Sequence, residues 1–135
     1  MAFQARFGLR YNDIRAADCS SVEAVGDFVY LTDYISGRDQ VRWADPKDYS
    51  KLPAVGAIIS KSSPTRCLVQ WMGETPEIYA GLSPGEIYFL GLNGKAVAIP
   101  PTAATVPVFV QPIGIALSDK KMYVRTESNL TRRVP

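Results

Sequence analysis

The sequence contains no histidine, and this absence limits the chemistry available to it. Histidine is the commonest general base, so neither a Ser-His-Asp nor a Cys-His catalytic site can be built. Two cysteines are present, Cys19 and Cys67, and without histidine they cannot complete a typical zinc site. Whether they form a disulfide stays open. We also find no Walker-type phosphate loop and no dinucleotide fingerprint, so we expect no cofactor, no metal and no enzyme.

Long hydrophobic runs and a strong charge of one sign are also lacking. No apolar stretch approaches the roughly 18 residues that would span a bilayer. The net charge is +2 with the basic residues scattered, whereas nucleic-acid binding would favour a basic stripe. The first residues show no signal-peptide pattern. We therefore expect no membrane and no nucleic-acid partner, and a protein that is made and folded in a cytoplasm.

Short runs rich in β-branched and aromatic residues occur along most of the chain, which favours strands. They lie at 28–31, 41–44, 55–59, 67–72, 87–90, 96–99, 106–110, 113–117 and 122–124. Asn93-Gly94 between two such runs is a strong hairpin signal, and Pro100-Pro101 ends a strand. The one helical candidate is a turn at 46–52. We predict an all-β fold, a small β-barrel or sandwich.

A degenerate internal repeat is the most informative feature of the sequence. The segment Gly26–Leu31 (GDFVYL) resembles Gly85–Leu90 (GEIYFL), and Val55–Ser60 (VGAIIS) resembles Ile113–Ser118 (IGIALS). The first pair is offset by 59 residues and the second by 58. Two motifs that share one offset predict two related β-units, at 25–73 and 84–126, within one domain at 25–126. We interpret residues 1–24 as an extended N-terminal arm and 127–135 as a C-terminal tail.

Several residues are candidates for chemistry or binding. Asp27 and Glu86 occupy equivalent repeat positions and could form an acid/base pair, although a turn carboxylate that accepts backbone N–H bonds is favoured. Asp45 and Asp48 could cap a helical turn. Trp43 and Trp71 could offer a stacking platform for a carbohydrate.

Most of the residues that we expect at an interface with another protein are basic. Three arginines lie in the expected arm and two in the expected tail, and one tryptophan lies in a strand. These possible interface residues are Arg6, Arg10, Arg15, Trp43, Arg132 and Arg133.

The second unit resembles a β module of tailed-bacteriophage structural proteins. The segments that carry the resemblance are Ala80–Leu90, Asn93-Gly94, Pro100-Pro101 and Val110–Ser118. Such modules occur in capsid decoration (cement) proteins and in tail-fibre or head-fibre proteins. The first unit, from Ala24 to Ile58, is similar to the small barrels of cement proteins. The resemblance covers roughly residues 24–126, and it brings no catalytic residues with it.

The resemblance implies a virion protein on the exterior of an icosahedral capsid. It implies the major capsid protein as partner, a homotrimer as assembly, and a role in stabilising the contacts between capsomers. The alternatives that stay open are a fibre component that binds the host surface, a carbohydrate-binding module and a small hydrolase that uses Asp27 and Glu86.

Overall fold

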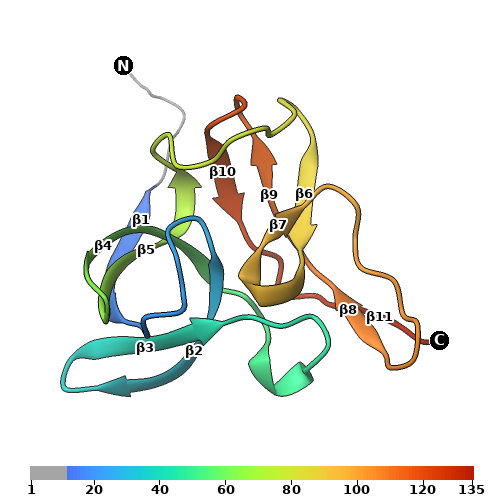
Figure 1. Cartoon of the computed structure of the whole chain (residues 1–135), viewed down its shortest axis with the longest axis horizontal. Helices are drawn as coiled ribbons and strands as arrows, with labels where there is room; N and C mark the ends of the chain where they lie inside the picture. The colour runs from blue at the N-terminus through green and yellow to red at the C-terminus, as the bar shows by residue number, and fades with distance from the viewer. Residues whose placement is uncertain (1–11) are drawn as a thin grey trace.

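The first half of the molecule is a closed five-stranded barrel (Figure 1). We describe residues 12–135 of a computed structural model; Arg6 and Arg10 lie outside this range. The order around the barrel is β1-β3-β2-β4-β5, and β1 pairs with β5 to close it. The strands are β1 (Asp13–Asp18), β2 (Phe28–Ile35), β3 (Arg38–Trp43), β4 (Gly56–Ser63) and β5 (Arg66–Glu74).

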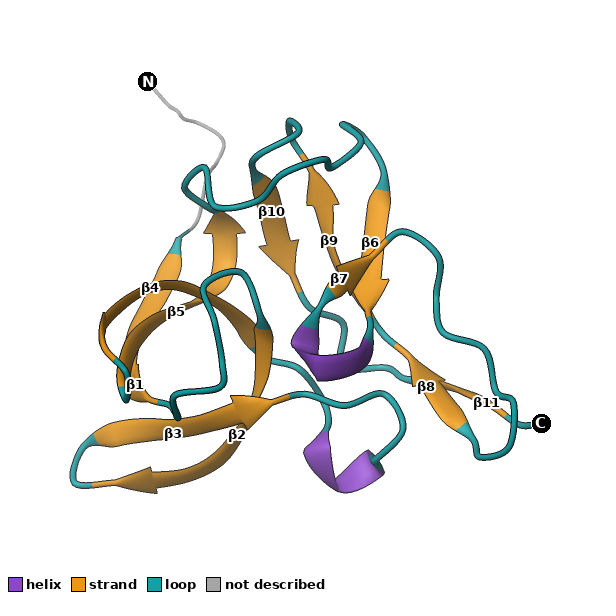
Figure 2. Ribbon diagram, in the orientation of Figure 1, coloured by secondary structure: helices purple, strands orange, loops and turns teal. Residues whose placement is uncertain are grey.

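The second half continues the same sheet and stays open. Here β10 pairs with the end of β5, and the order runs β5-β10-β9-β6-β7 (Figure 2). Two further strands, β8 and β11, pair in a separate ribbon. The elements are β6 (Ile87–Leu90), β7 (Ala96–Val97), β8 (Val108–Val110), β9 (Pro112–Ala116), β10 (Met122–Arg125), β11 (Thr131–Arg133), and two 3-10 turns, η1 (Tyr49–Lys51) and η2 (Leu92–Gly94).

These elements confirm the predicted all-β class and the predicted barrel. The expected turns also form where the residues allow them. Asn93 and Gly94 both have positive φ, 55° and 69°, as a tight connection between β6 and β7 requires. The helical turn expected at 46–52 is η1, and its N-cap Asp48 accepts a 3.0 Å hydrogen bond from the Ser50 backbone N–H.

The two similar sequence units form equivalent strand pairs, and corresponding residues face each other in both pairs. Val29 lies opposite Gly56 in the β2–β4 pair, and Tyr88 lies opposite Gly114 in the β6–β9 pair. Val29 and Tyr88 are 59 residues apart, and Gly56 and Gly114 are 58 residues apart, so the two offsets of the sequence repeat connect one pair with the other. Both pairs then continue into an antiparallel neighbour, β5 in the first half and β10 in the second.

The turns that lead into β2 and β6 are also the same. The backbone N–H of Gly26 donates to Ile58 O at 2.7 Å, and the N–H of Gly85 donates to Ala116 O at 2.8 Å. Both glycines have positive φ, 96° and 85°, which a residue with a side chain rarely adopts. The same conformation recurs because the same Gly-acid pair opens each strand.

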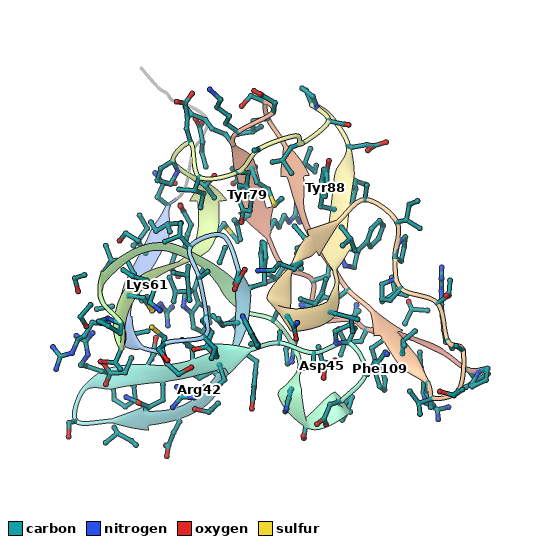
Figure 3. All side chains as sticks on the ribbon, viewed as in Figure 1. Arg42, Asp45, Lys61, Tyr79, Tyr88 and Phe109 are labelled. Atoms are coloured by element: carbon teal, nitrogen blue, oxygen red, sulfur yellow. The ribbon has the colours of Figure 1, made fainter. Side chains whose placement is uncertain are left out.

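Two apolar clusters stabilise the fold. One fills the barrel and contains Ala17, Cys19, Val29, Val41, Ile58, Cys67 and Val69. The other lies between the halves and joins Phe28 and Ala57 of the barrel to Tyr88, Leu90, Met122 and Val124 of the open half, with Tyr79 packed against it (Figure 3). Burial of these side chains is the main favourable contribution to folding.

The segment 13–24, which we expected to belong to an N-terminal arm, is part of the barrel. Strand β1 inserts between β3 and β5, and Ala17 is fully buried. Asp18 accepts hydrogen bonds from Arg38 Nε (2.8 Å) and Gln40 Nε2 (2.9 Å) on β3. The sequence of β1 reads as polar because its other positions face solvent or lie near the rim.

The loop after β1 is also held in place. Lys61 on β4 donates from Nζ to the backbone oxygens of Ser20 (3.0 Å) and Glu23 (2.6 Å) (Figure 3). Glu23 is itself buried, and its Oε1 accepts the N–H of Ser20 at 2.6 Å.

The expected C-terminal tail is likewise not a simple tail. Residues 131–133 form β11, which pairs with β8. Phe109 of β8 contacts Tyr49 of η1, with ring centroids 5.1 Å apart, so the ribbon packs against the connection between β3 and β4. Sequence pattern alone did not show this strand because its three residues are all exposed.

Candidate interaction surface

Asp27 is a buried carboxylate whose two oxygens are both engaged. It is 2% exposed. Oδ2 accepts from the Ala24 N–H (2.9 Å) and from Trp43 Nε1 (2.8 Å), and Oδ1 binds Lys95 Nζ at 2.6 Å. Because Lys95 follows η2, this ion pair connects the barrel to the open half. The arrangement is that of the turn carboxylate favoured by the sequence.

Glu86, at the equivalent position, is exposed and contributes to no such cluster. The environment of Asp27 also includes Tyr79, whose hydroxyl donates to Gly26 O at 3.0 Å. Burial, and then the charge of Asp27, raise the pKa of Tyr79. The two repeat carboxylates therefore have different surroundings, and the structure describes no contact that pairs them.

The two tryptophans lie in different environments. The indole of Trp43 is fixed by Asp27, and Gly94 packs beside it. Trp71 lies at the end of the barrel, where the Arg15 guanidinium covers its ring at 4.2 Å from the centroid. A ring face already occupied by a cation is a poor platform for a sugar, so this geometry does not favour the carbohydrate-binding alternative.

Cys19 and Cys67 lie together inside the barrel, both 4% exposed and both as free thiols. Burial, followed by a hydrogen bond with Cys19, raises the pKa of the Cys67 thiol to about 12. The thiols therefore contribute as small apolar groups of the core.

The β2–β3 hairpin extends beyond the barrel (Figure 1). Strand β2 pairs with β4 only at Phe28 and Val29, so its outer residues have no strand on that side among those described. Leu31, Tyr34 and Ile35 are 42%, 65% and 52% exposed. We call these three residues the hairpin tip. Exposed apolar side chains on a strand with a free edge are typical of a surface that binds another protein.

A second apolar surface covers the outward face of the open half. Ile87 and Ile115 lie opposite each other there and are 50% and 45% exposed. They line a groove of about 260 Å³, which we call the β9–β10 groove. Its lining residues are Ile87, Pro112, Gly114, Ile115, Tyr123, Arg125 and Glu127.

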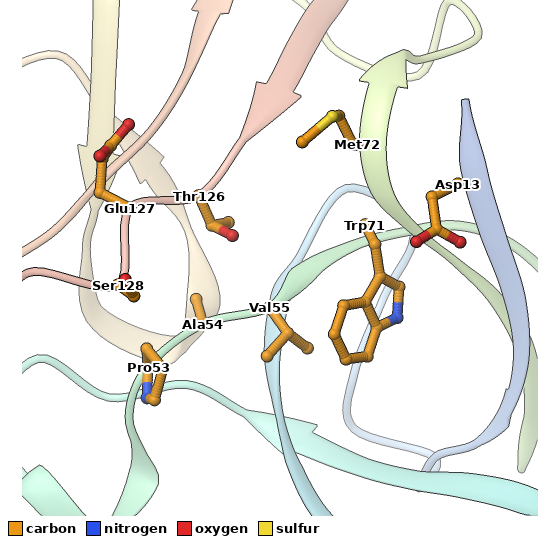
Figure 4. Close-up of a pocket in the computed structure, with 9 residues that line it drawn as sticks. All are labelled: Asp13, Pro53, Ala54, Val55, Trp71, Met72, Thr126, Glu127 and Ser128. Atoms are coloured by element: carbon orange, nitrogen blue, oxygen red, sulfur yellow. The ribbon is translucent and has the colours of Figure 1, made fainter. Parts of the chain in front are cut away.

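A third depression, the Trp71 pocket, adjoins this groove through the shared residue Glu127 (Figure 4). It has a volume of about 240 Å³. It lies beside Met72 of β5, which pairs with Asp13 of β1 and with Arg125 of β10. Asp13, Val55, Trp71 and Met72 form its walls on the barrel side.

The basic interface candidates are spread over distant elements. Arg15 is an exposed residue of β1 with an ion pair to Asp13 (3.1 Å). Arg132 and Arg133 are exposed on β11, and Arg133 donates to Pro101 O at 3.3 Å. The structure therefore places Arg15 and Trp43 in the barrel half and Arg132 and Arg133 on the β8–β11 ribbon.

Sequence reasoning missed both the hairpin tip and the β9–β10 groove. The alternation of strand residues could have suggested exposed positions, but only the pairing of β2 with β4 shows that the end of β2 is uncovered. Likewise, Ile87 and Ile115 lie in predicted strand runs, and the sequence does not show that the face they share is exposed.

Comparisons with protein-family models, with curated proteins and with solved structures found no match. Within residues 12–135, no helix is long and apolar enough to cross a bilayer. The same residues contain no group of three or more potential metal ligands.

Proposed function

We propose that this protein is a capsid decoration (cement) protein of a tailed bacteriophage. It binds the outer surface of the icosahedral head and stabilises the contacts between capsomers. The support comes from two sides: the sequence resemblance of both units to phage virion modules, and an apolar hairpin tip carried on a closed barrel.

The hairpin tip is the observation on which the proposal depends. Tyr34, at 65% exposure, and Ile35, at 52%, are large apolar side chains on an uncovered strand end. Aromatic residues are enriched at protein interfaces and contribute much of their binding energy. The closed barrel holds this tip on a rigid base, since β2 and β3 are both barrel strands.

The proposed partner is the major capsid protein, and the proposed assembly is a homotrimer on the capsid exterior. Each copy would bury a modest interface, and many copies together would stabilise the shell by mass action. Arg15, Arg132 and Arg133 are exposed and could add contacts with acidic capsid residues at the rim of that interface.

The decisive experiment is binding to expanded phage heads, followed by image reconstruction. We expect density for the barrel on the capsid exterior, at a copy number near that of the major capsid protein. A Tyr34→Ser, Ile35→Ser double variant should lose occupancy, whereas the matched Ile115→Ser variant should retain it.

Two results would contradict the proposal. One is density confined to a fibre or tail at tens of copies, which would favour the fibre alternative. The other is equal head occupancy for the hairpin-tip variant and the wild type. Light scattering of the pure protein tests the homotrimer separately, and a monomer at high concentration would contradict assembly before binding.

A further inference from the structure

A depression on the outer surface of the barrel is lined by positive charge and by hydroxyl groups. It has a volume of about 310 Å³ and is lined by residues of β1, β3, β4 and β5. Its charged and hydroxyl side chains are Arg38, Arg66, Ser60 and Ser62. Among the described residues that line it, none carries a carboxylate. The polar part of this lining therefore consists mainly of hydrogen-bond donors, which suits an anion.

The register of the barrel strands places these side chains on one face. Leu68 of β5 lies opposite Ala16 of β1 and opposite Ser60 of β4, and all three residues are exposed. Two residues before Leu68, Arg66 lies opposite Asp18 of β1. Because side chains two positions apart on a strand share a face, Arg66 and Asp18 point to the same outer side. The depression is thus built on three adjacent strands of the closed barrel.

Asp18 holds both arginines beside the depression. Its Oδ1 accepts from Arg38 Nε at 2.8 Å and lies 3.5 Å from Arg66 Nε, while its Oδ2 accepts from Gln40 Nε2 at 2.9 Å. The hydrogen bonds from Gln40 and Arg38, together with the charges of both arginines, hold the pKa of Asp18 below its ordinary value. One ionised carboxylate therefore faces two guanidinium groups, and one positive charge stays uncompensated within the cluster.

Both guanidinium groups keep N–H groups for a ligand. Arg38 donates from Nη2 to Ala17 O at 3.0 Å, which fixes its orientation and leaves Nη1 without a partner among the described residues. The Nη groups of Arg66 likewise have no hydrogen-bond partner in the described part of the chain. A guanidinium group presents its N–H groups in a planar fork, which matches two oxygens of a carboxylate or a phosphate.

We propose that this depression binds one oxyanion group, a carboxylate or a phosphate, between the two guanidinium groups. The oxyanion accepts hydrogen bonds from the Nη groups of Arg66 and from Arg38 Nη1, and the two serine hydroxyls add further donors. It also supplies the negative charge that the cluster lacks. The Arg66 side chain is 59% exposed, so water competes with the ligand, and we expect dissociation constants of about 1–10 mM for a small anion.

The site itself does not depend on the proposed function, because it needs only the folded chain. The proposed function bears on the source of the anion. Arg38 lies opposite Ile35 of the hairpin tip in the β2–β3 pair. A protein that is bound to the tip can therefore place an acidic side chain in the depression, whereas free phosphate needs no such partner.

The test is a titration of the isotope-labelled full chain, followed through its amide signals and the Nε–Hε signals of its arginines. The probes are inorganic phosphate and N-acetylglutamate amide, whose side chain is its only carboxylate, with sodium chloride at equal ionic strength as the reference. We expect saturable shifts at Arg38, Arg66 and Ser60, and none in β9 or β10. Saturation by both probes supports an acidic side chain as the natural occupant, and saturation by phosphate alone supports phosphate.

Two variants with the same change in net charge provide the control. Arg66→Gln should weaken binding about tenfold, because it removes charge-assisted hydrogen bonds. Arg125→Gln, at a similarly exposed arginine of the open half, should change the affinity less than about twofold. Equal weakening by the two variants would overturn the proposal, since binding would then reflect net charge alone. So would the absence of saturation by either probe up to about 50 mM, where a site with a millimolar dissociation constant is filled.

Discussion

The two halves of the molecule use one strand pattern and reach different results. In the barrel half, the β4–β5 hairpin has strands of eight and nine residues, long enough to curl until β1 pairs with β5. In the open half, β9 and β10 have five and four residues, and the sheet ends at the two-residue β7. Strand length, not register, decides whether the unit closes.

The difference appears most clearly at equivalent residues. Phe28 and Ala57 are fully buried, whereas their counterparts Ile87 and Ile115 are about half exposed. Val29 and its counterpart Tyr88 are both buried. The second unit therefore leaves one apolar face uncovered among the described residues, whereas the equivalent face of the first unit is buried in the core between the halves.

The largest expected effect separates Phe28 from Ile87. Phe28→Ala should lower the free energy of unfolding by about 4 kcal/mol, because it empties space in the core between the halves. Ile87→Ala should cost about 1 kcal/mol or less, since the side chain is half exposed. Urea denaturation measures both, and equal losses would break the comparison.

Equivalent glycines give the next effect. A Cβ on Gly56 would lie 2.3 Å from Gln70 O, and one on Gly114 would lie 2.6 Å from Tyr123 O. We expect Gly56→Ala to cost about 3 kcal/mol and Gly114→Ala about 2 kcal/mol, because a closed barrel shifts less easily than an open sheet. Thermal unfolding of the two variants measures both losses of stability. A loss for Gly114→Ala that equals or exceeds the loss for Gly56→Ala would mean that closure of the barrel adds no rigidity.

The repeat carboxylates should differ as well. Asp27→Asn removes the charge that pairs with Lys95, and it places an amide N–H₂ group against a neighbouring hydrogen-bond donor. We expect the free energy of unfolding to fall by about 2 kcal/mol. Glu86→Gln should leave stability unchanged within about 0.5 kcal/mol, as expected of an exposed site. Chemical denaturation of both variants checks this, and a destabilising Glu86→Gln would indicate a contact that the structure does not describe.

The smallest expected effect is a pH dependence that originates inside the barrel. The Cys67 pKa is raised from 9.0 to about 12, so the folded state retains a proton that the unfolded state releases. The contribution of Cys67 to stability should therefore be fully present below about pH 9 and be lost as the pH rises toward 12. Tyr79, whose pKa is also raised, acts with the same sign.

Cys67→Ala provides the control for that measurement. Its stability should fall less steeply than that of the wild type between pH 9 and pH 11 in urea titrations. A thiol reagent at pH 8 should react with neither cysteine until the protein is unfolded, and rapid reaction of the native protein would contradict a dry barrel interior.

Local patterns in the sequence predicted much of the fold. The runs at 28–31 and 87–90, the turn at Asn93-Gly94 and the offsets between Gly26 and Gly85 depend on neighbouring residues, so they could be read directly. The repeat also placed Gly56 and Gly114 at equivalent positions before their strand partners were known.

Long-range pairing could not be predicted in the same way. Strand β1 buries few of its residues, and it closes the barrel through partners that are distant in the sequence. Ala17 pairs with Asp39, more than twenty positions away, and Arg15 pairs with Val69, more than fifty positions away. The Asp27–Lys95 ion pair joins residues 68 positions apart, and no local pattern signals it. The hairpin tip is exposed because β4 pairs with β2 only at Phe28 and Val29. The extent of this pairing cannot be read from the local sequence either.

One measurement tests the shared register most directly. Cross-strand nuclear Overhauser effects in the isotope-labelled protein should connect Val29 with Gly56 and, equivalently, Tyr88 with Gly114. Effects that connect Gly114 with Ile87 or Phe89 instead would mean a slip by one residue, which turns every side chain of the strand to the other face. That result would contradict the duplication and remove the uncovered face of the open half.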